Sequence, residues 1–130
     1  MRACILVVEP DVRQQRSLVE VLRAFDYGAV GTPTVAHALL ALRGVAFDAV
    51  LVAVKPPHVE EIFRAAEVKK IQPDVKLIVV STEPPTVALP GELDEYVQDP
   101  SLLIAMETAL SRMFPATTVR RNHESGRKSA

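Results

Sequence analysis

The feature that most constrains the fold is a short apolar run at residues 50–54, which is followed by Lys55 and then by two prolines. The run is too short for a helix, and its valine-rich composition is typical of a strand that is buried on both faces. Strands of this kind lie at the centre of parallel sheets, in which ligands bind beyond the carboxyl ends of the strands. Residues 53–57 are therefore where we expect a functional site.

Similar apolar runs alternate with helical patterns along the rest of the chain. The predicted strands are residues 4–8, 29–32, 50–54, 76–81 and 96–97, and the predicted helices are residues 10–25, 34–44, 59–71 and 100–114. Strands that alternate with helices over short links predict an α/β fold with a doubly wound parallel sheet and right-handed crossovers. We expect five strands in the flavodoxin-like order 2-1-3-4-5.

Local signals predict how these helices begin and which residues they bury. Pro10 fits the first turn of the first helix, where its missing N–H costs nothing. Thr34 is a candidate N-cap for the second helix. Helical spacing of the apolar residues places Val12 in the first helix and Phe63 in the third on inward faces.

The alternation of strands and helices fails between the last two predicted strands. Residues 83–92 contain Pro84, Pro85, Pro90 and Gly91, which are too many helix breakers for a full helix. We therefore expect the fourth helix, which should connect these strands, to be shortened or missing.

The length of 130 residues suits a single domain, which we expect at residues 1–114, followed by a disordered basic tail at residues 115–130. Residues 116–130 carry four basic side chains and one glutamate, a net charge of +3. Because the whole chain has a net charge of −1, residues 1–115 carry −4. An acidic body argues against nucleic-acid binding by the folded domain.

The cysteine content and the N-terminus bear on the compartment. The single cysteine, Cys4, excludes an internal disulfide, and we expect it to be a buried strand residue without a redox role. The apolar stretch at residues 3–8 is too short for a signal peptide or a membrane span. We expect a cytoplasmic protein that makes no contact with membranes.

Four stretches of the sequence resemble, in order and in spacing, the receiver domain of bacterial response regulators. They are residues 5–11 (ILVVEPD), 47–57 (FDAVLVAVKPP), 72–81 (QPDVKLIVVS) and 94–100 (DEYVQDP). They resemble the first strand with its acidic loop, the phosphoacceptor strand, the strand that ends in a switch hydroxyl, and the last strand. The resemblance covers about residues 3–113 and implies a role in a two-component, motility or development-type pathway.

Position by position, the resemblance implies a degenerate phosphorylation site. In the family, an aspartate accepts the phosphoryl group, two acidic residues hold Mg²⁺, and a hydroxyl and a lysine bind the phosphoryl oxygens. The residues at these positions are Ala53 for the acceptor, Glu9 and Pro10 for the acidic pair, Ser81 for the hydroxyl and Asp99 for the lysine. Because Ala53 cannot carry a phosphoryl group, we expect no aspartyl phosphorylation, no enzymatic activity, and neither metal nor cofactor.

Several side chains near this site have two interpretations each. Lys55 is either solvated or pairs with a carboxylate in place of the metal, the candidates being Glu9, Asp11 and Asp99. Asp11 either caps the first helix or supplies a metal ligand. Ser81 and Tyr96 either form a switch-like pair, or Tyr96 is a fixed aromatic residue.

These features together predict a phosphorylation-independent adaptor that acts through protein–protein interaction. The predicted interaction surface lies on the last strand and the last helix and consists of Tyr96, Val97, Leu102, Leu103 and Met106. The partner is expected to be a histidine kinase, another signalling protein, or a second copy in a homodimer. A second candidate surface is the exposed face of the first helix, with Arg13, Gln14, Arg16 and Arg23.

Alternatives from other classes stay open. An atypical phosphoacceptor, or a sensor of a small ligand or ion, would use Glu9, Asp11 and Ser81. The chain could also be the regulatory fragment of a transcription regulator, with residues 115–130 as the remains of a linker, although no helix-turn-helix follows in this sequence. An unrelated flavodoxin-like enzyme is disfavoured, because the sequence contains no catalytic constellation.

Overall fold

The computed structural model describes residues 2–55, 60–98 and 103–115. Its elements in chain order are β1 (Cys4–Val8), α1 (Val12–Ala24), β2 (Gly28–Thr32), α2 (Val35–Gly44), β3 (Ala49–Ala53), α3 (Glu60–Ala65), α4 (Val68–Ile71), β4 (Lys76–Ser81), β5 (Glu95–Gln98) and α5 (Leu103–Met113). The predictions for Asp99, Leu102, the Leu103 side chain and residues 116–130 lie outside the described part of the chain.

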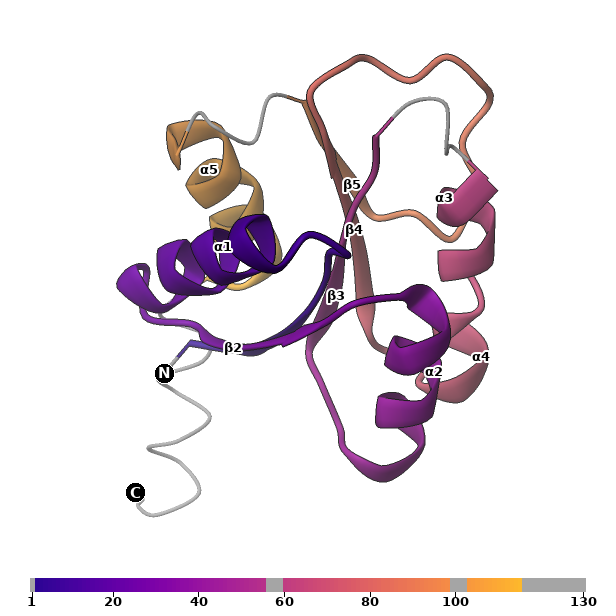
Figure 1. Ribbon diagram of the computed structural model, residues 1–130, viewed down its shortest axis with the longest axis horizontal. Helices are drawn as coiled ribbons and strands as arrows, with labels where there is room; N and C mark the ends of the chain where they lie inside the picture. The colour runs from indigo at the N-terminus through magenta and orange to yellow at the C-terminus, as the bar shows by residue number, and fades with distance from the viewer. Residues whose placement is uncertain (1, 56–59, 99–102, 116–130) are drawn as a thin grey trace.

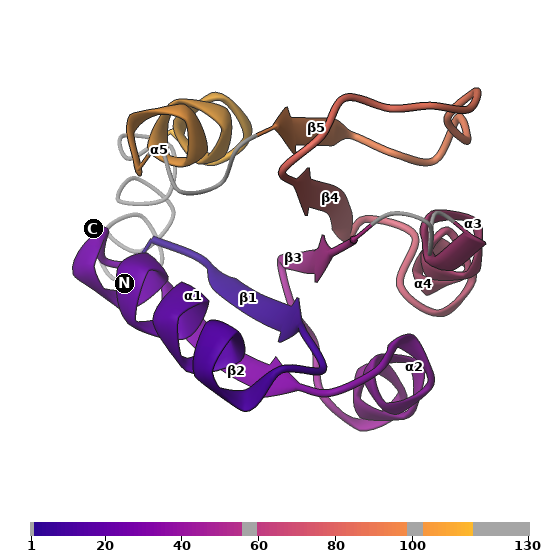
Figure 2. The same ribbon diagram turned by 45° about the horizontal axis from the view of Figure 1, so that its top comes forward.

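The five strands form one parallel sheet in the order β2-β1-β3-β4-β5, which confirms the predicted fold and strand order. Helices α1 and α5 cover one face of this sheet, and α2, α3 and α4 cover the other (Figures 1 and 2). Strand β3 lies at the centre, and its residues Val50 and Leu51 are fully buried. The short apolar run therefore is the strand buried on both faces that the sequence predicts.

Alternation along the strands divides the core into two layers, because successive strand side chains point to opposite faces. One layer packs beneath α1 and α5 and includes Ile5, Val7, Leu22, Leu51, Ile78, Met106 and Leu110. The other packs beneath α2, α3 and α4 and includes Leu6, Val8, Val35, Leu42, Val50, Val52, Ile62, Val68, Leu77 and Val79.

Helix α1 begins at Val12, two residues later than predicted. The Asp11 carboxylate caps it by accepting hydrogen bonds from the backbone N–H groups of Arg13 (2.9 Å) and Gln14 (3.0 Å). Pro10 thus precedes the cap and is not in the first turn. Val12, the first residue of the helix, is 66% exposed, so its predicted inward position is wrong.

The predicted third helix is divided into α3 and α4, with Ala66 and Glu67 between them. At the break, backbone N–H groups bond to carbonyls three residues earlier, as in a 3₁₀ turn. Side chains three apart eclipse each other in such a turn, so Ile62, Ala65 and Val68 share the buried face. The prediction that Phe63 faces inward is therefore wrong.

The connection between β4 and β5, residues 82–94, contains no helix, which confirms that the expected fourth helix is missing. Leu89 and Leu93 of this connection pack with Tyr96 against the core layer beneath α2, α3 and α4. Asp94 fastens the connection to the sheet, because its carboxylate accepts a 2.8 Å hydrogen bond from the Leu77 N–H and pairs with Lys69 at 2.7 Å.

Cys4 is the first residue of β1 and is only partly buried, so the prediction of a buried thiol is wrong. Desolvation by the surrounding protein raises the pKa of this thiol, and the negative charge of Asp48 raises it further. The Cys4 N–H donates to the Asp48 carboxylate at 2.8 Å, which joins the start of β1 to the residue before β3.

Arg2 joins the start of the described chain to the end of α5. Its guanidinium carbon lies 4.7 Å from the centre of the Tyr27 ring, a cation–π contact. The same guanidinium donates hydrogen bonds of 3.2 Å to the Ser111 hydroxyl and to the Phe114 carbonyl. The Phe114 ring in turn meets Tyr27 in an edge-to-face arrangement, with centroids 6.4 Å apart.

Among the described residues, no helix combines the length and the apolar character that crossing a membrane requires.

Candidate functional site

The carboxyl ends of the central strands meet at one edge of the sheet, as the sequence predicts. Val8 pairs with Val52, and Ala53 pairs with Val80, so the strand-end residues lie at the same level. Glu9 directly follows β1, Ala53 ends β3, and Ser81 ends β4. The structure therefore brings three of the predicted site residues together.

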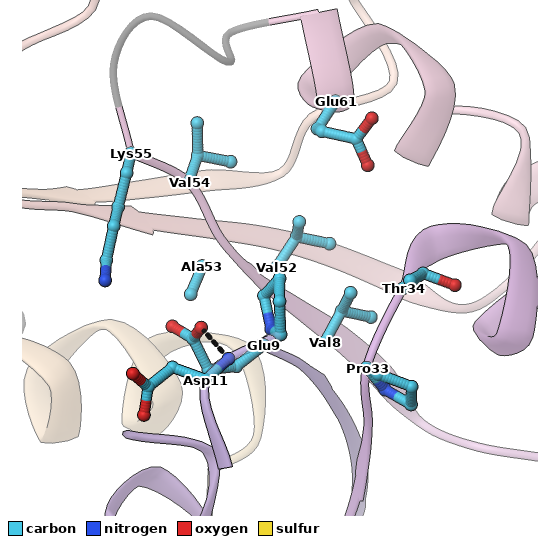
Figure 3. Close-up of a pocket in the computed structure, with 11 residues that line it drawn as sticks. Val8, Glu9, Asp11, Pro33, Thr34, Val52, Ala53, Val54, Lys55 and Glu61 are labelled. Carbon is cyan, nitrogen blue, oxygen red and sulfur yellow. Dashed lines mark hydrogen bonds between the residues drawn. The ribbon is translucent and has the colours of Figure 1, made fainter. Parts of the chain in front are cut away.

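Two adjoining pockets open at this edge and share Glu9, Ala53, Val54 and Lys55 as walls. The first, of about 370 Å³, extends toward α2 and α3 and is lined also by Val8, Pro10, Asp11, Pro33, Thr34, Val52 and Glu61 (Figure 3). The second, of about 310 Å³, extends toward α1 and α5 and is lined also by Gln14, Ser17, Leu18, Val21, Val80, Ser81, Thr82 and Met106. The strand-end site is thus a double hollow with Ala53 in its shared wall.

Glu9 is the buried acidic group of this site, with only 3% of its surface exposed. The Glu9 N–H donates a 3.0 Å hydrogen bond to the Thr32 carbonyl. The Glu9 carbonyl accepts a 2.9 Å hydrogen bond from the Gln15 side-chain amide. Within the described residues, its carboxylate accepts one hydrogen bond, of 2.8 Å, from the Asp11 N–H (Figure 3). The other carboxylate oxygen makes no protein hydrogen bond there.

Asp11 fulfils the capping role, because one of its carboxylate oxygens accepts both N–H groups of the first turn of α1. Its carboxylate lies apart from the hydrogen bond that joins its backbone N–H to Glu9 (Figure 3). The sequence left capping and metal ligation open, and the contacts support capping.

The described residues do not fit the Mg²⁺ ion that the receiver fold implies. Mg²⁺ requires several oxygen ligands in near-octahedral geometry. Pro10 and Ala53 carry no side-chain oxygen, and the described parts of the chain contain no group of three His, Cys, Asp or Glu side chains that could hold a metal.

Lys55 stands at the mouth of both pockets, and its side chain extends toward the side where the Glu9 and Asp11 carboxylates lie (Figure 3). No ion pair joins it to either carboxylate in the structure as described, so the predicted pairing with these two residues is wrong. The residue is exposed, and an extended lysine loses little by keeping its ammonium group in water.

Ser81 and Tyr96 converge on one residue of the connection between β4 and β5. The buried Ser81 hydroxyl accepts a 3.2 Å hydrogen bond from the Glu83 N–H. The Tyr96 hydroxyl donates a 2.7 Å hydrogen bond to the Glu83 carbonyl. Both side chains are thus bonded to backbone groups of the same residue, Glu83, which favours a fixed aromatic over a switch-like pair.

Two residues of the predicted interaction surface are buried. Val97 is 5% exposed and Met106 is 1% exposed, because both point into the core layer between the sheet and helices α1 and α5. Their assignment to the surface is wrong. Tyr96 is half-buried, and Ile104 on α5, which the sequence interpretation did not single out, is 79% exposed.

The second pocket is the feature that the sequence interpretation missed. Leu18 and Val21 of α1 pack against the core layer beneath α1 and α5, and both also line this hollow. The one signal in the sequence is Ala53, because a methyl group at the end of β3 leaves space that a longer side chain would fill.

The fold matches solved structures of receiver domains and their relatives. A pilus assembly-related protein of Burkholderia pseudomallei is 18% identical, with a TM-score of 0.75 over 86% of this chain and 89% of that chain. The response regulator TrrA of Thermotoga maritima, solved with Mg²⁺ and BeF, is 20% identical, with a TM-score of 0.74 over 85% and 97%.

A CheY-like receiver domain of Methylobacillus flagellatus is 19% identical, with a TM-score of 0.72 over 87% and 99% of the two chains. No protein-family model and no curated protein matches the sequence. The similarity therefore lies in the structure, and it shows that this chain has the fold of the CheY-like response-regulator receiver domains.

Proposed function

We propose that this chain is a non-enzymatic, receiver-like signalling domain that acts through protein–protein contact and without aspartyl phosphorylation. The observation that carries the proposal is the end of β3, where a methyl group, Ala53, forms the shared wall of two pockets. A phosphoacceptor needs a nucleophilic oxygen at this place, and alanine has none.

The neighbouring polar groups do not replace the acceptor. Glu9 is buried, Asp11 caps α1, and the Ser81 hydroxyl is bonded to the Glu83 N–H. Phosphoryl transfer depends on a metal ion and cationic groups that neutralise the transferring oxygens. Of the residues that the structure describes, Lys55 is the only lysine lining either pocket, and it is exposed.

A protein partner is supported by the fold and by an exposed apolar side chain. One of the solved structures that match this chain, at 20% identity, contains the response regulator TrrA in complex with the histidine kinase ThkA. In the chain itself, Ile104 on α5 is 79% exposed, and it directly follows the predicted surface residues Leu102 and Leu103 in the sequence. We propose that α5 and the free edge of β5 contact a signalling protein or a second copy of the chain.

The basic side chains of α1 form the second proposed contact surface. Arg13, Arg16 and Arg23 are exposed, and Arg23 also donates a 2.9 Å hydrogen bond to the Ala29 carbonyl. This face would suit an acidic surface of a kinase.

The test is an amide NMR titration with Mg²⁺ and then with beryllofluoride, a phosphoryl mimic. We expect no saturable shifts at Glu9, Ala53 or Ser81, because the acceptor oxygen and a fitting metal site are both missing. TrrA, solved in complex with Mg²⁺ and BeF, is the positive control under the same conditions. Saturable shifts clustered at these residues would refute the proposal and favour an atypical phosphoacceptor.

A further inference from the structure

The second pocket contains a buried acid that lacks a counter-charge. Glu9 is 97% buried, and within the described residues its carboxylate accepts one hydrogen bond, from the Asp11 N–H. Buried charges in proteins are ordinarily paired or bound to a metal, because moving an unpaired charge out of water costs roughly several kcal/mol. Because Glu9 lines the pocket, a cation or a hydrogen-bond donor bound there could bond the second carboxylate oxygen.

The chain itself does not provide this cation in the parts that the structure describes. Lys55 is the closest candidate by position, yet it makes no ion pair with Glu9 and stays exposed at the mouth. The Gln15 amide is occupied by the Glu9 backbone carbonyl. The described residues contain no group of three acidic, histidine or cysteine side chains that could hold a divalent metal.

The residues that line the second pocket indicate which kind of cation would fit. Leu18 and Val21 from α1, Val80 from β4 and Met106 from α5 surround the hollow with hydrocarbon and thioether groups. Polar side chains, those of Gln14, Ser17, Ser81 and Thr82, complete the lining. A hydrated inorganic ion would gain nothing from the apolar walls, whereas an organic molecule would bury its apolar part there.

The charge around the mouth favours a positively charged ligand over an anion. Among the described residues, the charged side chains that line the second pocket are the buried Glu9 and the exposed Lys55, and the adjoining first pocket adds the carboxylates of Asp11 and Glu61. The pocket of about 310 Å³ is roughly twice the size of a 150 Å³ apolar cavity that holds benzene in another protein. It therefore has room for one aromatic ring with a short side chain.

We propose that this pocket binds a small organic ammonium ion with an apolar body, such as an arylalkylamine. The ammonium group donates to the free oxygen of Glu9, and the apolar body lies between α1, α5 and the end of β4. This ligand binding goes beyond the proposed adaptor function, since it does not depend on which partner protein binds the domain. It also needs neither phosphoryl chemistry nor a metal.

The test is an NMR titration of the whole chain with 2-phenylethylamine and, as a matched neutral probe, 2-phenylethanol. We expect saturable amide shifts at Glu9, along Gln14 to Val21 and at Ser81 and Thr82. The amine should bind about tenfold more tightly than the alcohol, because a charge-assisted hydrogen bond is about twice as strong as a neutral one. Equal affinities, or shifts that do not saturate, would overturn the proposal.

The variant Glu9→Gln tests the role of the carboxylate. The amide keeps an acceptor for the Asp11 N–H, so we expect a folded protein whose amine affinity falls about tenfold, to that of the alcohol. The control is Glu20→Gln, which removes the same charge from an exposed position of α1 outside the pocket and should leave both affinities unchanged. An E9Q variant that binds the amine as tightly as the wild type would refute the proposal.

A pocket-filling variant provides a second test if E9Q proves unstable. Ala53→Leu extends the shared wall into the hollow, so both probes should lose binding. If either probe bound a folded A53L protein as tightly as the wild type, the binding site would lie elsewhere and the proposal would be overturned. A negative amine titration together with a negative beryllofluoride titration would leave the adaptor function standing, so the two proposals fail separately.

Discussion

At the scale of single residues, the carboxylates beside β1 have different roles although they lie two positions apart. Asp11 is exposed and satisfies backbone N–H groups at the start of α1, whereas Glu9 is buried and faces the pockets. The two carboxylates therefore differ in how far they are buried. The sequence could predict the cap, because an acid just before an amphipathic segment is a local signal. It could not predict the free oxygen of Glu9, which depends on what surrounds it.

The capping role of Asp11 leads to a stability prediction. Asp11→Ala should lower the free energy of unfolding by about 1 kcal/mol, because the N–H groups of Arg13 and Gln14 lose their acceptor. Urea denaturation followed by circular dichroism measures this change. Asp74→Ala, at an exposed position before β4, is the control and should change stability little. A D11A variant as stable as the wild type would argue against the cap.

At the scale of elements, the connection between β4 and β5 replaces a helix by a few specific contacts. Asp94 bonds the Leu77 N–H and Lys69, Tyr96 bonds the Glu83 carbonyl, and Leu89 and Leu93 cover the sheet. The prolines in the sequence predict that the helix is missing, because a proline in the interior of a helix removes a hydrogen bond and clashes with the preceding turn. The contacts that replace it join residues from three elements, so no local pattern reveals them.

The contacts of Asp94 make this connection sensitive to acid. Partial burial acts to raise the pKa of Asp94, but the hydrogen bonds from Lys69 and from the Leu77 N–H outweigh it and lower the pKa below the usual 3.8. A carboxyl group with a lowered pKa in the folded state stabilises the protein above its unfolded-state pKa. This stabilisation is lost as the pH falls through the folded-state value.

Asp94→Asn should therefore cost about 1–2 kcal/mol of stability at neutral pH, and progressively less below about pH 4. Chemical denaturation at a series of pH values measures the difference between variant and wild type. Glu92→Gln, an exposed acid in the same connection, is the matched control and should show no such pH dependence. A cost for D94N that stays constant down to about pH 2 would contradict the role of the ionised carboxylate.

At the scale of the whole molecule, the two core layers determine which parts of α5 can meet a partner. The sequence predicts α5 as an amphipathic helix, and periodicity alone places Met106 among its apolar residues without showing which of them the sheet covers. The packing of α5 on the sheet, where it shares a core layer with β5, decides this. Met106 and Val97 are therefore covered, and Ile104 is left exposed.

Two substitutions on α5 test this division. Met106→Ala should lower the free energy of unfolding by about 2 kcal/mol or more, because it removes buried contacts in the core layer beneath α1 and α5. Ile104→Ala, on the exposed side of the same helix, should change it by less than about 0.5 kcal/mol. Thermal or urea unfolding of both variants gives the comparison. Similar effects of the two substitutions would contradict the assignment of Met106 to the core.

The contacts of Arg2 with Ser111 and Phe114 give the domain a nearly circular topology. Residues 2 and 114 are 112 positions apart in the sequence, yet one guanidinium group bonds both segments. A short glycine-rich linker could therefore connect these ends, and the exposed, helix-free connection at residues 82–94 would be a natural place to reopen the chain. In the native order, this contact closes the largest loop among the hydrogen bonds of the described residues. Closing that loop costs the most chain entropy, so we expect the contact to form late in folding.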